Sequence, residues 1–198
     1  MSVVFANNNS LSAITALPTS ISGGSLNLIS TSTASSSSTL SFTSGIDSTY
    51  KEYMFKFINI HPAEAEHFTF QASTNGGTSY GVTLTSTYFH ATHDEGDSST
   101  ALAYVAGKDL AQSTSYLRLA DSLSTSADES TSGTLHLFDP SNTTHIKHFI
   151  SRSSVAATGA KDGFIAGYFN TTSAINAIQF KMSSGNIDSG VIKLYGVS

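Results

Sequence analysis

Apolar and polar side chains alternate one by one along most of this 198-residue chain. Successive residues of a β-strand point to opposite faces of a sheet, so a period of two indicates strands with one face in a core. The segment 32–38, "STASSSS", is typical of a loop. The alternation predicts strands at residues 25–31, 39–45, 52–60, 67–73, 80–89, 114–123, 132–140, 145–152 and 163–170, with two more strands within 177–197.

Two of these segments predict where the core lies. Residues 52–60, "EYMFKFINI", carry apolar side chains on both faces, with Met54, Ile58 and Ile60 sharing one of them, which indicates a central strand. At the end of the chain, two alternating runs flank a Gly-containing loop, and we expect them to form a hairpin that closes the core. Their predicted core residues are Ile178, Phe180, Met182, Ile192 and Leu194.

Turn signals separate the predicted strands. Asn75-Gly76-Gly77 supplies residues that tolerate positive φ, which predicts a hairpin turn. Residues 98–112, "SSTALAYVAGKDLAQ", are compatible with a short helix or with a loop that crosses one end of the fold. Many short strands with little helical periodicity predict an all-β fold, an antiparallel β-sandwich.

The first 24 residues follow a different pattern. They contain many apolar residues without regular alternation, Pro18 argues against one continuous helix, and Gly23-Gly24 offers a flexible joint. We therefore predict an N-terminal attachment or assembly arm at 1–24 and a single β-sandwich domain at 25–198. The apolar residues predicted to dock the arm onto a neighbouring copy, a capsid or a tail are Val3, Val4, Phe5, Leu11, Ile14, Leu17 and Ile21.

Composition narrows the classes of function. Only 12% of residues are charged, nine of them basic against fourteen acidic, so no basic patch for nucleic acid is expected. No apolar run approaches the roughly 20 residues that span a bilayer, and the N-terminus lacks the order of a secretory signal. Because the sequence has no Cys, disulfides and thiolate sites are excluded. We expect no cofactor, no nucleic acid and no membrane insertion.

The segment 88–97, "YFHATHDEGD", has the residue types of a metal site. Its candidate ligands are His90, His93 and Asp94. On a strand, positions three apart face opposite sides, so both histidines reach one metal only if the chain turns between them. We interpret the segment as an exposed polar loop without a metal.

Catalytic patterns are weak. Carboxylates are available for a polysaccharide hydrolase at Asp94, Glu95 and Asp97, and at Asp128 and Glu129, but Ser- and Gly-rich surroundings make a raised pKa hard to maintain. His148 shares a face with Ile146 and Ile150, which predicts a buried structural histidine. We therefore predict that the protein is not an enzyme.

Carbohydrate binding is a stronger alternative. Sugar sites place an aromatic ring beneath the sugar and surround it with hydroxyl and amide groups. The chain has no Trp, and the tyrosines available for stacking are Tyr80, Tyr88 and Tyr104.

Three segments resemble one family. They are "SFTSGIDSTYKEYMFKFINIHPA" (41–63), "SGTLHLFDPSNTTHIKHF" (132–149) and "AGYFNTTSAINAIQFKMSSGNIDSGVIKLYGVS" (166–198), and "NNSLSAITALP" (8–18) also fits. Together they look like small virion structural proteins of marine tailed bacteriophages. "FQASTNGGTSY" (70–80) also resembles a strand-turn segment of phage adhesins.

The resemblance implies a jelly-roll-like sandwich in the virion, with other capsid or tail proteins as partners, and it transfers no active-site residues. It leaves open a tail fibre or adhesin module and a capsid decoration protein. A homo-oligomer, for instance a trimer, is expected because such proteins are commonly trimeric and sandwich edges are open to pairing. A module that binds host-surface glycan and a hydrolase remain the competing hypotheses.

Overall fold

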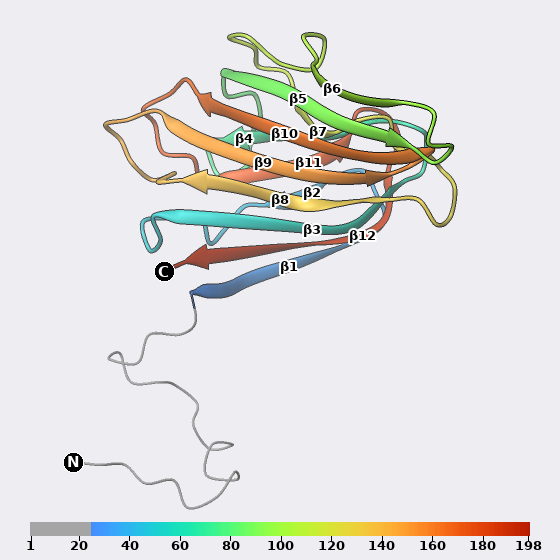
Figure 1. Ribbon diagram of the computed structural model, residues 1–198. Coiled ribbons are helices and arrows are strands. Elements are labelled where there is room, and N and C mark those ends of the chain that lie inside the picture. The colour runs from blue at the N-terminus through green and yellow to red at the C-terminus, as the bar shows by residue number, and fades with distance from the viewer. Residues whose placement is uncertain (1–24) are drawn as a thin grey trace, which may run out of the picture.

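Two antiparallel sheets packed face to face make up the part of the protein that the computed structural model describes, residues 25–198 (Figure 1). The prediction of an all-β sandwich is confirmed, and no helix occurs within residues 25–198. The predicted arm, 1–24, lies outside the described residues.

The larger sheet has eight strands. Their spatial order is β1 (Leu26–Ser37), β12 (Ile187–Val197), β3 (Glu52–Pro62), β8 (Thr131–Phe138), β9 (Lys147–Ala156), β10 (Gly159–Phe169), β5 (Leu84–Asp94) and β6 (Thr100–Tyr104). The smaller sheet has the order β2 (Leu40–Phe42), β11 (Ala177–Met182), β4 (Phe68–Ser73) and β7 (Leu117–Ala120).

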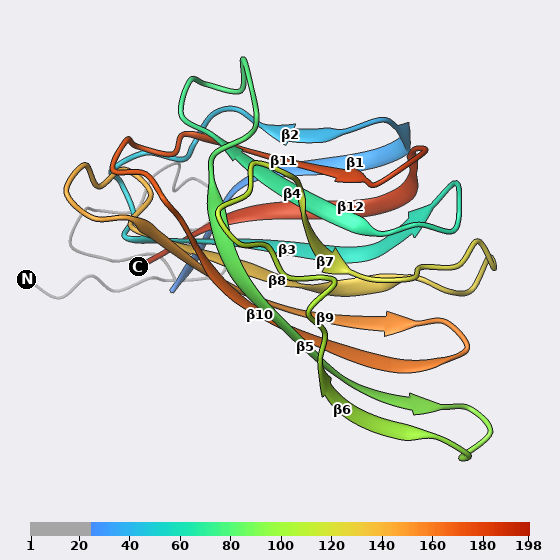
Figure 2. The same ribbon diagram turned by 90° about the horizontal axis from the view of Figure 1, so that it is seen from above.

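The connections define a jelly roll. The orders β1-β12-β3-β8 and β2-β11-β4-β7 form two facing four-stranded sheets between which the chain repeatedly crosses, as in a double Greek key. Strands β5, β6, β9 and β10 are additions to this plan, and all four extend the larger sheet beyond β8. In the view from above, β5 and β6 reach past the smaller sheet (Figure 2).

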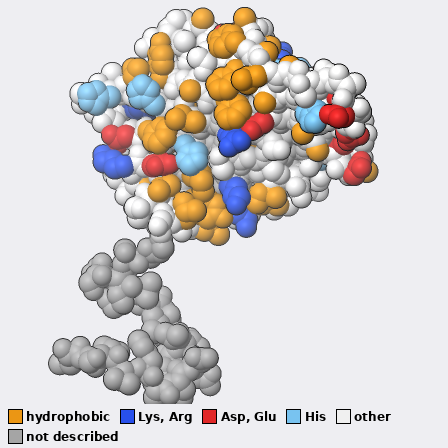
Figure 3. Space-filling view, in the orientation of Figure 1, with side chains coloured by type: hydrophobic (Ala, Val, Ile, Leu, Met, Phe, Trp, Pro, Cys, Tyr) orange, Lys and Arg blue, Asp and Glu red, His pale blue; other side chains and the backbone are white. Residues whose placement is uncertain are grey.

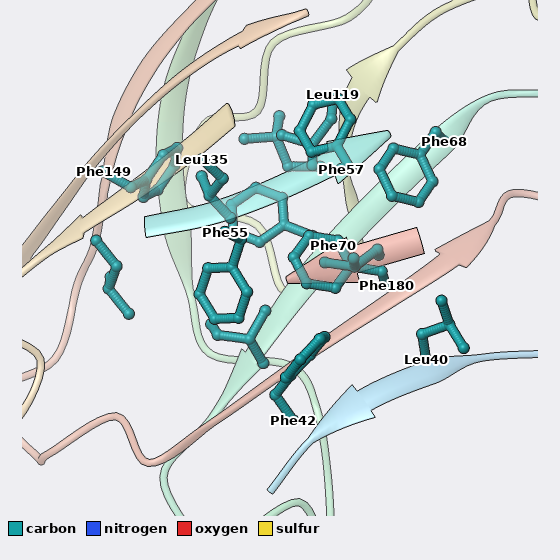
Figure 4. Close-up of a cluster of buried hydrophobic side chains, with 14 of the residues drawn as sticks. Leu40, Phe42, Phe55, Phe57, Phe68, Phe70, Leu119, Leu135, Phe149 and Phe180 are labelled. Atoms are coloured by element: carbon teal, nitrogen blue, oxygen red, sulfur yellow. The ribbon is translucent and has the colours of Figure 1, made fainter. Parts of the chain in front are cut away.

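Aromatic side chains fill the space between the sheets (Figure 4). Phe55 and Phe57 point inward from β3, and Phe68, Phe70 and Phe180 meet them from the smaller sheet. All five rings are completely buried. The five predicted core residues of the C-terminal region are buried as well, none of them more than 1% exposed.

The C-terminal strands do not form the predicted hairpin. β11 pairs with β2 and β4 in the smaller sheet, whereas β12 pairs with β1 and β3 in the larger one. The loop between them therefore crosses from one sheet to the other. Similarly, the Asn75-Gly76-Gly77 segment is a turn, but it connects β4 and β5, which belong to different sheets.

Two other predictions of local structure are wrong, and of the two alternatives for residues 98–112 the helix is excluded. The hydroxyl-rich segment 32–38 is mostly strand, because β1 continues to Ser37 by backbone pairing with β12, which needs no apolar side chains. Residues 98–112 form β6 and turns and contain no helix. Ile60 faces the core with Phe57, because a register shift between them, with Asn59 at φ 50°, reverses the alternation.

The orientation of β9 is the reverse of the prediction. Lys147, Phe149 and Ser151 face inward, whereas His148 and Ile150 face solvent. The buried Lys147 amine donates hydrogen bonds to the main-chain oxygens of His145 (2.8 Å) and Thr171 (3.2 Å), which satisfy a group that would otherwise be costly to bury. Burial lowers the pKa of this amine.

Candidate interaction face

The side of the larger sheet that points away from the smaller sheet is called the outer face here. Strand alternation places every second side chain of the eight strands on it. The six exposed large hydrophobic side chains of residues 25–198 all lie on this face, as the register of the sheet shows. They are Leu26, Leu28, Phe89, Leu102, Tyr104 and Ile150. Figure 3 shows hydrophobic groups distributed over this side of the molecule.

An aromatic ridge lies in the β9–β10–β5 part of the outer face. Phe89 stacks on its cross-strand neighbour Phe164, with ring centroids 4.8 Å apart and planes 5° from parallel. The guanidinium of Arg152, on β9, lies over the ring of Phe164, 4.9 Å from its centroid. These three side chains protrude in defined positions, because each contacts a partner on the next strand.

Most charges on the outer face are neutralised within it. Arg152 donates from Nε to Oδ1 of Asp162 at 3.0 Å and also contacts the other carboxylate oxygen. His136 Nδ1 lies 2.6 Å from the carboxylate of Glu52. Asp162 holds the pKa of the Arg152 guanidinium above its ordinary value through this hydrogen bond and its charge.

Lys56 and Lys193 are the exception. They are directly opposite each other in the β3–β12 register, and neither has an ion-pair partner within residues 25–198. Like charges in this position repel, which is a local cost to the sheet. The outer face therefore combines exposed apolar side chains with hydroxyl-bearing ones such as Thr31, Thr87 and Thr134, most of its charges are paired, and Lys56 and Lys193 form one small basic site.

Two hollows flank the ridge. One, of about 530 Å³, is lined by small residues such as Ala91 and Ser132 together with charged ones such as Arg152 and Asp162. The other, of about 460 Å³, is lined by apolar and aromatic groups that include Ile150, Ala166 and Tyr168. A protein surface or segment of complementary shape can bind to such a face, with its side chains in the two hollows.

The predicted metal ligands do not come together. The chain does not turn between His90 and His93, because β5 runs through both to Asp94, so the interpretation of this segment as a loop is wrong up to Asp94. His90 points inward, whereas His93 points outward and lies 3.0 Å from Asp97. Within the described residues, no group of three His, Asp or Glu side chains could hold a metal ion.

The carboxylates considered for hydrolysis lie in two separate turns. Asp94 accepts hydrogen bonds from the Ser98 hydroxyl and from the main-chain N–H groups of Ser99 (2.8 Å) and Ser98 (2.9 Å), which lower its pKa. A general acid needs a raised pKa, so this environment does not suit that role. Asp128 and Glu129 line a different hollow beside Asn59 and His61.

The three candidate tyrosines are in three environments. Tyr88 is completely buried and cannot stack on a ligand, and burial raises its pKa. Tyr104 is 56% exposed on the outer face, with its hydroxyl bonded to Asp109. Tyr80 lines a hollow of about 370 Å³ together with hydroxyl and amide side chains.

A buried ionic cluster was missed by the sequence reasoning. Asp121, whose side chain is 3% exposed, accepts a hydrogen bond from Lys108 and lies 3.3 Å from Arg118 and 3.6 Å from Lys161. Burial alone would raise the pKa of Asp121, but the hydrogen bonds from Lys108 and Ser122 and the charges of Lys108 and Lys161 bring it to about 2.

His67 belongs to the same cluster as a neutral group. Its Nδ1 lies 3.2 Å from Asp121 but accepts the main-chain N–H of Ser122 at 3.1 Å, so this nitrogen carries no proton. Burial, followed by the charge of Arg118, lowers the pKa of His67. The cluster joins β7, β10 and the 105–110 loop, and its contacts are those of a structural network that fastens the added strands to the jelly roll.

Comparisons with known proteins found no protein-family model, curated protein or solved structure that matches the chain. Within residues 25–198, no helix has the length and apolar character required to cross a membrane.

Proposed function

We propose that this chain is a non-enzymatic structural protein of a bacteriophage virion, placed on the outer surface of the particle as a tail fibre or adhesin module or as a capsid decoration protein. The outer face of the larger sheet carries the proposal. Its six exposed large hydrophobic side chains all lie on this one side of the molecule, and exposed apolar surface gathered on one side is typical of proteins that bury it against another protein.

The area of the face suits stable association. Eight strands spaced ~4.8 Å apart and ~30 Å long present an area on the order of 1,000 Å², and a standard interface buries about 800 Å² per partner. The pairing of Arg152 with Asp162 and of Glu52 with His136 lowers the cost of covering these charges, because each already has its partner.

Two further observations support the virion assignment. The double-sheet jelly roll recurs in viral capsid and lectin domains, although a fold by itself does not define a function. The sequence resemblance to virion proteins of marine tailed bacteriophages points in the same direction and covers residues in both sheets. Other virion proteins and further copies of the same chain are the expected partners.

Mass spectrometry and electron cryomicroscopy of purified virions test the proposal. We expect the chain in the particle with its outer face covered by protein. A copy number close to that of the major head protein would indicate decoration, and one close to that of the fibre proteins would indicate the tail. Absence from purified particles, or presence with the outer face in solvent, would refute the proposal.

Glycan binding is the second candidate, favoured by the hollow at Tyr80. The residues that line the hollow include Tyr80, Thr83, Asn170 and Thr171, which carry an aromatic ring, hydroxyl groups and a side-chain amide. A ring surrounded by hydrogen-bonding groups is the arrangement that a sugar requires. The hydroxyl oxygen of Tyr80 is buried without a hydrogen-bond partner within the described residues.

A glycan array with the native protein, followed by titration of any hit, tests this candidate. We expect Tyr80→Ala to abolish binding and Tyr104→Ala, which changes a tyrosine outside the hollow, to preserve it. No hit with the native oligomer, or equal binding by both variants, would remove the Tyr80 site.

A further inference from the structure

We propose that the N-terminal segment 1–24 of a neighbouring copy lies across the outer face. This inference rests on the proposed role in assembly, and it names the segment that covers the face. It thereby connects residues 1–24 with the outer face of the sandwich formed by residues 25–198.

The place where the segment enters the domain is the first argument. Residue 24 leads directly into β1, the edge strand of the larger sheet. Leu26 and Leu28, the first large side chains of that strand, are 50% and 56% exposed and lie on the outer face. The segment and the face therefore meet at the same border of the sheet.

Chemical complementarity is the second argument. Residues 1–24 contain no Asp, Glu, Lys or Arg and include the seven apolar side chains predicted to dock the arm. Such a segment can cover a face whose exposed large side chains include six apolar ones and whose charges are mostly paired, without bringing a new charge to it. The ammonium groups of Lys56 and Lys193 require acceptors, and backbone carbonyls and the amides of Asn7 to Asn9 can supply them.

Length is the third argument, because it allows the segment to pass beyond its own sheet. Seven spacings of ~4.8 Å make the eight-stranded sheet about 34 Å wide. At ~3.3–3.6 Å per residue, the 20 positions between Phe5 and Ser25 reach about 70 Å when extended. At full extension, the stretch from Ser25 to Val3-Val4-Phe5 can thus span about twice the width of the sheet, which is enough to reach the outer face of an adjacent molecule.

Photo-crosslinking of the full chain tests the inference directly. Phe5 is replaced by a photoactivatable phenylalanine analogue, and ¹⁴N- and ¹⁵N-labelled protein are mixed before assembly. We expect mixed-isotope crosslinks from position 5 to outer-face residues of β9, β10 or β5. Crosslinks confined to a single copy, crosslinks to the smaller sheet, or a chain that stays monomeric would overturn the inference.

Matched variants test the same contact through self-association. Ala166, in the centre of the outer face, and Ala65, in the β3–β4 turn, are both exposed, and each is changed to Glu. Ala166→Glu should weaken self-association at least about tenfold, because the new carboxylate would be covered without a partner, whereas Ala65→Glu should not change it.

A chain lacking residues 2–24 should fold, melt cooperatively and sediment as a monomer. Full-strength assembly by this truncated chain or by Ala166→Glu would refute the inference. The test also separates the two proposals: crosslinks between copies in a protein absent from virions would remove only the virion role, whereas virion incorporation with crosslinks confined to one copy would remove only the arm contact.

Discussion

Phe180 occupies the centre of the core, so its replacement by Ala provides a severe test of the packing. It lies on β11, between Leu40 and Phe70 in the register of the smaller sheet, and is completely buried. Its ring centroid lies 5.3 Å from Phe55, which belongs to the facing sheet, and 5.7 Å from Phe68. The ring therefore contacts both layers of the sandwich.

The expected loss follows from these contacts. Truncation of a buried Phe to Ala costs about 3–5 kcal/mol, including the cavity that remains. We expect a value in the upper part of this range, because aromatic pairs add about 0.5–1.5 kcal/mol each beyond area burial and the two sheets cannot close around the gap. For a domain of this size, each kcal/mol lowers Tm by about 2–4 °C, so the variant should melt about 8–20 °C below the wild type.

Thermal and urea unfolding followed by circular dichroism measure this loss. Phe89→Ala is the control, because that ring is 39% exposed on the outer face and removing it leaves no closed cavity. If Phe180→Ala destabilised the protein no more than Phe89→Ala did, Phe180 would not be the centre of the core. The assignment of β11 to the inner layer would then be wrong.

Three smaller perturbations test other parts of the structure. The pKa of Asp121 is lowered to about 2, so its charge stabilises the fold above about pH 5, and roughly 2–3 kcal/mol of the free energy of unfolding should be lost as the pH falls toward 2. In urea unfolding, Asp121→Asn should lose less stability than the wild type over this pH range. Equal pH profiles for the two proteins would contradict the assignment. Gly133→Ala should lower Tm strongly, since its Cβ would lie 2.2 Å from the Arg152 main-chain oxygen, whereas Gly107→Ala, with no atom within 4 Å, should not. Lys147→Met should cost about 1–3 kcal/mol in the same assay, because the two hydrogen bonds from the buried amine to the main-chain oxygens of His145 and Thr171 would be lost. An unchanged unfolding midpoint would refute that role.

The additions to the jelly roll explain why the outer face is so extensive. Strands β9, β10, β5 and β6 double the width of the larger sheet without adding a strand to the smaller one. Their outward side chains supply Phe89, Ile150 and Leu102, and the Asp121 cluster fixes part of this extension from the inner side. The broad face is thus a consequence of the inserted hairpins.

The alternation of the sequence determined where most strands lie and which residues share a face. Residues 52–60 were predicted as a central strand, and β3 lies between β12 and β8. Ile178, Phe180 and Met182 were predicted as one buried row, and all three are buried. These results follow from strand geometry alone, because a period of two needs no knowledge of distant residues.

Only the tertiary structure decided which face of a strand is buried and which strands pair. On β9, the predicted inner row of His148 and Ile150 is the outer one, because the row of Lys147, Phe149 and Ser151 finds its packing and hydrogen-bond partners between the sheets. The Asp121 cluster joins residues more than 50 positions apart in the sequence, from His67 to Asp121, and no local pattern encodes that approach. Alternation defines two faces for each strand, but the choice between them depends on the whole set of long-range contacts that bury one and leave the other in solvent.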